Sequence, residues 1–212
     1  MLTINEIFHS IQGESTLAGR PCVFVRLTAC DLRCSWCDTE YAFYEGAKRD
    51  LDDVVAEVLR YDCDLVELTG GEPLLQPGVH DLAIALLDRG RTVMIETGGH
   101  RDISALDPRV RRIVDVKTPS SGEAARMHWP NLDVLREGDE VKFVIQDRAD
   151  FDYAADVIRR HGLEARVPLL LSPVHGKLDA AELARWILES GIRARLQLQL
   201  HKILWPAALR GV

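Results

Sequence analysis

Three cysteines of this chain, Cys30, Cys34 and Cys37, lie within eight residues in a CxxxCxxC arrangement. A cubane iron–sulfur cluster held by protein thiolates alone takes four cysteines. Three neighbouring cysteines therefore leave one iron without a protein ligand. Since an open coordination position is where a bound metal does chemistry, as at catalytic zinc sites, the spacing favours a reactive cluster over one that only carries electrons.

The composition indicates a folded protein of a reducing compartment. Its 212 residues are 47% hydrophobic, and we expect a single domain over residues 1–212. The net charge of −7 disfavours non-specific binding of nucleic acid. No apolar run reaches the roughly 20 residues of a membrane span, and the first residues do not resemble a signal peptide. We therefore expect a cytoplasmic protein whose clustered cysteines bind metal, with Cys22 and Cys63 as buried structural thiols.

Short apolar strands alternate with amphipathic helices along the chain. We expect strands at residues 23–27, 65–69, 92–96, 112–116, 141–145, 167–171 and 195–199. Helices are expected at residues 51–60, 78–88, 151–160 and 180–189, with Asp50 and Asp179 as N-caps. This order predicts an α/β fold with a parallel sheet and crossover helices. The chain is shorter than a full eight-fold barrel, so we expect an incomplete, TIM-like barrel of about six parallel strands.

Glycines and polar side chains recur where the predicted strands end. The first of these strand ends reads TGGEP at residues 69–73, the second ETGG at 96–99, and the third DVKTPSSG at 115–122. Each segment alone is typical of an ordinary turn. Together they favour a binding site, because the carboxyl ends of parallel strands meet at one edge of a sheet or barrel, where ligands bind.

The CxxxCxxC motif followed by Gly-Gly-Glu-Pro resembles the radical S-adenosylmethionine superfamily. More narrowly, the chain resembles the 7-carboxy-7-deazaguanine synthase family in residues 6–14 (EIFHSIQGE), 19–21, 26, 37–39, 69–73, 96–99, 117 and 199–202. The resemblance implies a four-iron, four-sulfur cluster whose open iron binds S-adenosylmethionine, and a 5′-deoxyadenosyl radical formed on reduction. It also implies conversion of 6-carboxy-5,6,7,8-tetrahydropterin to 7-carboxy-7-deazaguanine with loss of ammonia, dependent on Mg²⁺.

The resemblance also implies roles for individual residues. The three cysteines would bind the cluster and Thr39 the magnesium ion, and no side chain is expected to act as a nucleophile. Residues expected to bind S-adenosylmethionine are Trp36, Cys37, Asp38, Gly71, Glu72, Asp115, Lys117, Ser172, Pro173, Val174 and His175. Residues expected to bind the substrate are Gln12, Gly13, Glu14, Arg26, Thr69 and His201. Arg26 would hold the substrate carboxylate as a fork, and Gln12 and Glu14 would meet ring nitrogens.

Three other functions are consistent with the cysteine motif. A glycyl-radical-enzyme activase shares the motif but acts on a protein. A zinc-stabilised binding module without catalysis would need a fourth ligand, and an electron carrier would need a fourth cysteine. The resemblance further implies a flavodoxin or ferredoxin as electron donor and a homodimer, with no nucleic-acid or membrane partner. Some relatives end just after the position of His201, whereas this chain continues to Val212, so the role of its C-terminal residues stays open.

Overall fold

The alternation of strands and helices forms one mixed sheet in the computed structural model, which describes residues 1–206 and 209–212. Over these residues the sheet has nine strands in the order β3-β1-β2-β4-β5-β6-β7-β8-β9. The strands are β1 (Leu2–Ile11), β2 (Pro21–Leu27), β3 (Ala47–Arg49), β4 (Leu65–Gly70), β5 (Thr92–Thr97), β6 (Arg111–Asp115), β7 (Glu140–Ile145), β8 (Leu169–Pro173) and β9 (Arg195–Leu196). The α-helices are α1 (Leu51–Val58), α2 (Gly78–Leu87), α3 (Arg148–Arg160), α4 (Ala180–Ser190) and α5 (Leu200–Leu204).

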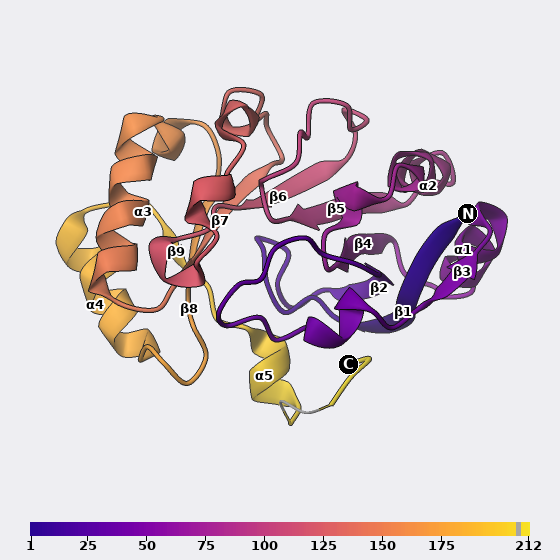
Figure 1. Ribbon diagram of the computed structural model, residues 1–212, viewed down its shortest axis with the longest axis horizontal. Coiled ribbons are helices and arrows are strands. Elements are labelled where there is room, and N and C mark those ends of the chain that lie inside the picture. The colour runs from indigo at the N-terminus through magenta and orange to yellow at the C-terminus, as the bar shows by residue number, and fades with distance from the viewer. Residues whose placement is uncertain (207–208) are drawn as a thin grey trace.

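Strands β2 and β4 to β9 run parallel to one another, whereas β1 pairs antiparallel with both β2 and β3. The expected partial barrel of parallel strands is therefore confirmed, as an open sheet with an antiparallel edge (Figure 1). Strand β1 was not expected from the sequence. Most of its residues are only half-buried, so the strand has no continuous apolar run of the kind that marks a fully covered parallel strand.

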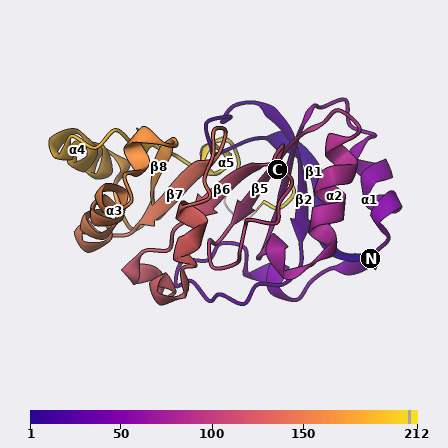
Figure 2. The same cartoon turned by 90° about the horizontal axis from the view of Figure 1, so that it is seen from above.

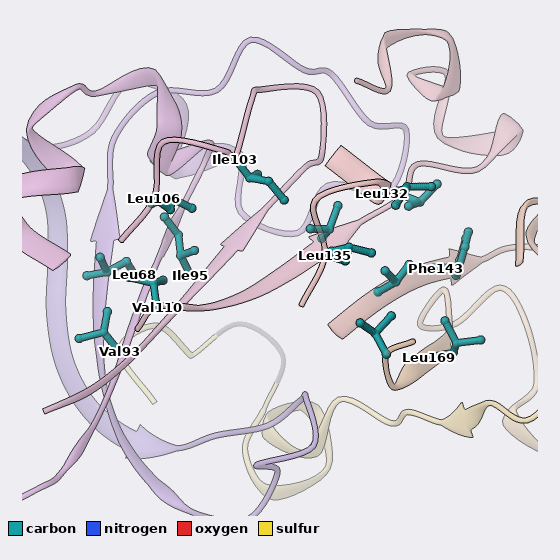
Figure 3. Packing of buried hydrophobic residues seen from close by; sticks show 14 of the residues in the cluster. Leu68, Val93, Ile95, Ile103, Leu106, Val110, Leu132, Leu135, Phe143 and Leu169 are labelled. Atoms are coloured by element: carbon teal, nitrogen blue, oxygen red, sulfur yellow. The ribbon is translucent and has the colours of Figure 1, made fainter. Parts of the chain in front are cut away.

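Two of the crossover connections contain no α-helix, in agreement with the absence of an expected helix between residues 96 and 141. Figure 2 shows α1 and α2 at one end of the sheet and α3 and α4 at the other. Between β5 and β6, and between β6 and β7, the sheet is covered by irregular segments with short 3₁₀ turns. Their buried side chains take the place of a helix: Figure 3 shows Ile103, Leu106 and Val110 beside Ile95, and Leu132 and Leu135 toward Phe143.

Several predicted boundaries shift in the structure. The strand expected at 167–171 lies at Leu169–Pro173, and only Arg195–Leu196 of the segment 195–199 is a strand. The side chain of Asp179 caps α4 as expected, by accepting from the backbone N–H of Ala181 at 2.7 Å. That of Asp50 makes no capping hydrogen bond to α1.

The two faces of the parallel strands have different chemistry. On β4, Val66 and Leu68 belong to the main hydrophobic core, while Glu67 and Thr69 face the opposite way and line a cavity. A small second core of Cys22, Leu65, Met94 and Ile113 closes the amino-terminal end of this inner face. The buried positions of Cys22 and Cys63 confirm their expected packing role. The polar side chains that line the cavity therefore lie toward the carboxyl-terminal half of the inner face.

No helix within residues 1–206 and 209–212 has both the length and the apolar character needed to cross a membrane.

Candidate active site

A cavity of about 950 Å³ opens at the carboxyl-terminal ends of the parallel strands. Its walls come from the inner face of the sheet, from the cysteine segment between β2 and β3, and from the C-terminal residues around α5. All of the predicted site residues except Ser172 line it. Ser172 is buried, and its hydroxyl donates to the main-chain carbonyl of Gln197 at 2.9 Å. The expectation that it contacts a cofactor thus finds no support in its geometry.

Cys30, Cys34 and Cys37 all reach this cavity from one irregular segment. The segment is anchored through Asp31, whose carboxylate is 2.7 Å from His100 Nε2 and accepts from Arg126 at 2.8 Å. These partners hold the pKa of Asp31 well below its ordinary value, against the opposing effect of burial. His100 is therefore a structural anchor for the cysteine segment.

The donor set fits an iron–sulfur cluster better than a single metal ion. Burial raises the pKa of the Cys34 thiol to about 11, so that a stable thiolate there needs a cationic partner, which iron supplies. Among the described residues, no three His, Cys, Asp or Glu side chains come close enough together to hold one ion. The thiolates of a cubane cluster bind different irons and are accordingly spread wider than single-ion ligands.

Gly71 lets β4 approach the cysteine segment closely. A Cβ atom at Gly71 would lie 2.2 Å from the carbonyl oxygen of Ala29 and 2.7 Å from the Cβ of Cys30. The backbone N–H of Glu72 donates to the same Ala29 carbonyl at 2.8 Å. Only glycine permits this contact, which fixes the first cysteine against the end of the strand.

Glu72 is committed to the protein itself. Its carboxylate accepts hydrogen bonds from the hydroxyl of Thr97 at 2.9 Å and from the backbone N–H groups of Leu74 at 3.0 Å and Gly98 at 2.8 Å. The side chain is 1% exposed. Its contacts tie the ends of β4 and β5 together, so it shapes the cavity wall that faces the cysteines.

Asp115 and Lys117 face the cavity after β6 as an ion pair, with Lys117 Nζ 2.6 Å from Asp115 Oδ2. Burial alone would lower the pKa of Lys117, but Asp115 and Cys34 hold it well above its ordinary value. The second carboxylate oxygen, Asp115 Oδ1, is buried and has no hydrogen-bond partner within the described part of the chain. A buried acceptor beside the thiols fits a polar ligand that carries N–H or O–H donors.

Arg26 lies in the part of the cavity lined by β1 and β2. Its Nε donates to Glu6 Oε1 at 2.8 Å, and the hydroxyl of Tyr41 donates to the same oxygen at 3.1 Å. The guanidinium also lies 5.7 Å from the ring centre of Phe8 and 5.8 Å from that of Tyr41. Its Nη1 and Nη2 groups make no hydrogen bond to the described residues, which leaves a fork suited to a carboxylate.

The C-terminal segment docks between the loop of residues 12–14 and the cysteine segment. The N–H of Leu200 donates to the carbonyl of Gly13 at 3.0 Å, and Lys202 Nζ donates to Asp38 Oδ2 at 2.6 Å. A Cβ atom at Gly13 would lie 2.4 Å from His201 Nδ1, so the loop accommodates the imidazole only because this residue is glycine. Burial lowers the pKa of His201, which keeps the imidazole neutral at pH 7.

Residues beyond the predicted strand ends complete the site. Thr39, whose hydroxyl donates to Asp38 Oδ1 at 2.9 Å, lines the cavity near the cysteines, and Pro173, Val174 and His175 line it after β8. The C-terminus also reaches it: Arg210 pairs with Glu45 at 2.9 Å and lies 3.8 Å from the ring centre of Tyr41.

Two charged residues on the cavity floor, Glu67 and Lys142, were not expected from the sequence, and no role had been given to the neutral amide of Gln199. Lys142 Nζ contacts Glu14 Oε2 and lies 2.8 Å from Glu96 Oε1, while Gln199 donates to Glu14 Oε1 at 2.9 Å. The available signal was a charged residue inside an otherwise apolar strand, as in LVELTG and EVKFVI. Such a residue is rarely buried without a partner or a function.

The model of the radical SAM superfamily matches residues 25–164 of the chain. The chain belongs to this superfamily, which implies a four-iron, four-sulfur cluster and S-adenosylmethionine as cofactors. Within it, the chain belongs to the family of 7-carboxy-7-deazaguanine synthases, and its recognition from motifs is confirmed. It is 45% identical to the 7-carboxy-7-deazaguanine synthase of Koribacter versatilis, with 100% of both chains covered. It is 44% identical to that of Chlorobaculum tepidum, covering 100% of this chain and 97% of the relative.

Solved structures support the fold. The chain resembles the crystal structure of QueE from Escherichia coli with a TM-score of 0.73 and 22% identity, over 93% of each chain. It also resembles Streptococcus suis SuiB bound to S-adenosylmethionine, with a TM-score of 0.58 and 14% identity, over 81% of this chain and 48% of that one. At these identities the likeness concerns the arrangement of strands and helices.

Proposed function

We propose that this chain is a 7-carboxy-7-deazaguanine synthase, which converts 6-carboxy-5,6,7,8-tetrahydropterin to 7-carboxy-7-deazaguanine and ammonia. The observation that carries the proposal is that one cavity joins three cysteines to an arginine fork and a floor of carboxylates and amides. The cysteines suit a radical-generating cluster, and the polar floor suits a flat, nitrogen-rich ring. An activase, which acts on a protein, has no need of so enclosed a polar floor.

When bound, the cluster and S-adenosylmethionine would supply the radical chemistry of the reaction. The chain's own residues would bind and orient the cofactor and the substrate. In the proposed arrangement Cys30, Cys34 and Cys37 would hold the cluster, and Gly71, the Asp115–Lys117 pair and the segments at 36–38 and 173–175 would hold the cofactor. Glu72 would act indirectly, because its hydrogen bonds to Thr97, Leu74 and Gly98 hold the cavity wall in place.

On the substrate side, Arg26 receives the carboxylate, and Gln12, Gly13, Glu14, Thr69 and His201 surround the ring. Lys142 keeps Glu14 charged: burial would raise the pKa of Glu14, but Lys142 holds it below its ordinary value. Docking of α5 against Gly13 and Asp38 holds His201 at this side of the cavity.

We infer that a magnesium ion binds through the Thr39 hydroxyl and the substrate carboxylate, since Mg²⁺ prefers hard oxygen ligands and retains water. Membership of the family also supports a reduced flavodoxin or ferredoxin as electron donor, a homodimer and a cytoplasmic location. Replacing Thr39 with Val removes the oxygen and should weaken the dependence of the rate on added Mg²⁺, whereas Thr39→Ser should retain it.

The proposed activity is tested with reconstituted protein under anaerobic conditions. Dithionite, S-adenosylmethionine, Mg²⁺ and 6-carboxytetrahydropterin are added, and the products are identified by mass spectrometry. We expect 7-carboxy-7-deazaguanine, lost in Cys34→Ala and retained in the matched control Cys63→Ala, whose thiol is buried in the hydrophobic core. Formation of 5′-deoxyadenosine without the deazaguanine would refute the substrate, and a reconstituted protein without a cluster would refute the whole assignment.

A further inference from the structure

Three glutamates, Glu14, Glu67 and Glu96, share the floor of the cavity with a single lysine. Lys142 Nζ pairs with Glu14 and with Glu96, the latter at 2.8 Å. Glu67 has no such cation and accepts a hydrogen bond only from the side-chain amide of Gln12 among the described residues. The floor therefore carries one carboxyl group whose charge is not balanced by the protein.

The amide of Gln12 holds Glu67 in place. Its Nε2 donates to Glu67 Oε2, and its Oε1 accepts from the backbone N–H of Glu14 at 3.0 Å. Gln12 is 2% exposed and lies over Met94 of the small inner core, with Nε2 3.5 Å from the sulfur. The carboxyl group of Glu67 is thus fixed at the boundary between the small second core and the polar cavity.

Among the described residues, Glu67 accepts a side-chain hydrogen bond only from Gln12, and a carboxylate can accept several more. Burial, reinforced by the neighbouring Glu96, raises its pKa to about 8. A carboxyl group in this position is stabilised by N–H donors on a ligand, because those donors replace the water it has lost. Glu14 and Glu96 have less need of such donors, since Lys142 already serves both.

We propose that Glu67 is a specificity-determining residue that accepts hydrogen bonds from the 2-amino group and the adjacent N3–H of the substrate's aminopyrimidinone ring. This inference rests on the proposed function and deepens it. Two neighbouring N–H donors match the two oxygens of a carboxylate in the way that an arginine fork does. The remote carboxylate of the same substrate would then lie toward Arg26, so that opposite charges of the site fix both ends of the ring system.

The 2-amino group and the adjacent ring N–H are unchanged by the reaction, so the product also carries them. Binding of the product therefore tests the inference without turnover. The product 7-carboxy-7-deazaguanine carries the amino group, whereas 7-carboxy-7-deazahypoxanthine lacks it and is otherwise matched. A site built around hydrogen bonds to N–H groups rejects a ligand without them, because its buried acceptor is then left unpaired. We expect the protein to bind the amino compound at least about tenfold more tightly than the deamino compound.

The decisive experiment compares Glu67→Gln with the wild-type protein. Equilibrium dissociation constants for both ligands are measured by calorimetry on reconstituted protein without reductant, alongside kcat and KM for the pterin. We expect Glu67→Gln to weaken binding of the amino compound about 10- to 100-fold and to lose the preference for it. Glu57→Gln is the matched control, since its carboxylate pairs with Arg49 on the far side of α1 and does not line the cavity.

Glu67→Met, which keeps the side-chain volume and removes both oxygens, provides a second test and should lose the same preference. Circular dichroism checks that each variant is folded. Unchanged affinity and unchanged preference in folded Glu67 variants would overturn the inference and leave the proposed function standing. If the wild-type protein forms no deazaguanine and binds neither ligand, the proposed function fails, and the inference fails with it.

Discussion

The close approach of Gly71 to the cysteine segment gives the sharpest test of how the fold positions the cluster. In Gly71→Ala the new methyl group would lie 2.2 Å from the Ala29 carbonyl oxygen, where ordinary contact begins at 3.4 Å. The neighbouring atom is backbone, which cannot rotate away as a flexible side chain can. The segment carrying Cys30 must therefore move by roughly 1 Å, since packed interiors have little free space.

Two effects of this displacement can be estimated. Overpacking of this kind costs about 2 kcal/mol, which in a chain of this size lowers Tm by about 4–8 °C. The larger effect concerns the cluster, because a misplacement of roughly 1 Å in a catalytic arrangement can cost about 100-fold in rate. We expect Gly71→Ala to fold, to bind less than the full complement of iron, and to lose most of its activity.

Iron and sulfide content after anaerobic reconstitution, together with electron paramagnetic resonance of the reduced protein, measures the cluster directly. Gly78→Ala is the matched control: its φ is also unstrained, and its new methyl group would meet only the end of the Leu2 side chain, at 3.2 Å. That control should retain a full cluster. A Gly71→Ala protein with full iron content and wild-type kcat/KM would refute the steric reasoning.

Three further predictions concern charged groups. Glu6→Gln should raise KM for the pterin about tenfold with little change in kcat, because Arg26 loses its ionic partner; Glu6→Asp should restore part of the affinity, and an unchanged KM would contradict a positioning role. Asp139→Asn should lower the free energy of unfolding by about 3–5 kcal/mol in urea titrations, since it leaves the buried Arg112 unpaired; a loss below about 1 kcal/mol would count against it. The pKa of Glu67, raised to about 8 from 4.5, means that the folded state holds a proton between these values which the unfolded chain has released. Stability should therefore fall as pH rises through this window, and the fall should be smaller in Glu67→Gln.

The parallel part of the sheet was predictable because its strands are covered on the core face by apolar side chains in short runs. Strands β4 and β5, for example, lie within one residue of the expected ranges at both ends. Strand β1 and the helix-free connections were not predictable in the same way. The side chains that cover β5 and β6, such as Ile103 and Leu132, lie in segments interrupted by Pro108 and Pro130, and their burial depends on tertiary contacts.

The cysteine segment and the glycine-rich strand ends were predictable because their residues are close together in sequence, so that the residue types alone indicate the chemistry. Residues 172–175 mark the limit of that approach. Pro173, Val174 and His175 reach the cavity, whereas Ser172 lies one position earlier on β8 and turns its hydroxyl to Gln197. Ser172 pairs in register with Val144, which lines the cavity, so alternation along the strand would place it on the cavity face; what removes it is the tertiary contact to Gln197, which no local sequence pattern shows.

The ionic state of the cavity floor could not be derived from motifs at all. Glu14 belongs to a recognisable loop and Glu96 to a recognisable strand end, yet what separates them from Glu67 is the position of Lys142, which the fold brings over from β7. One lysine beside three carboxyl groups cannot neutralise them all, so one site on the floor is left to be satisfied by a proton or by a ligand.

If the ligand satisfies it, substrate binding should release the proton that Glu67 holds in the free protein. Calorimetric titrations in buffers of different ionisation enthalpy, run near pH 7, should therefore detect proton release on binding of the deazaguanine to the wild-type protein and less of it in Glu67→Gln. Equal proton release in both proteins would show that the released proton comes from a group other than Glu67.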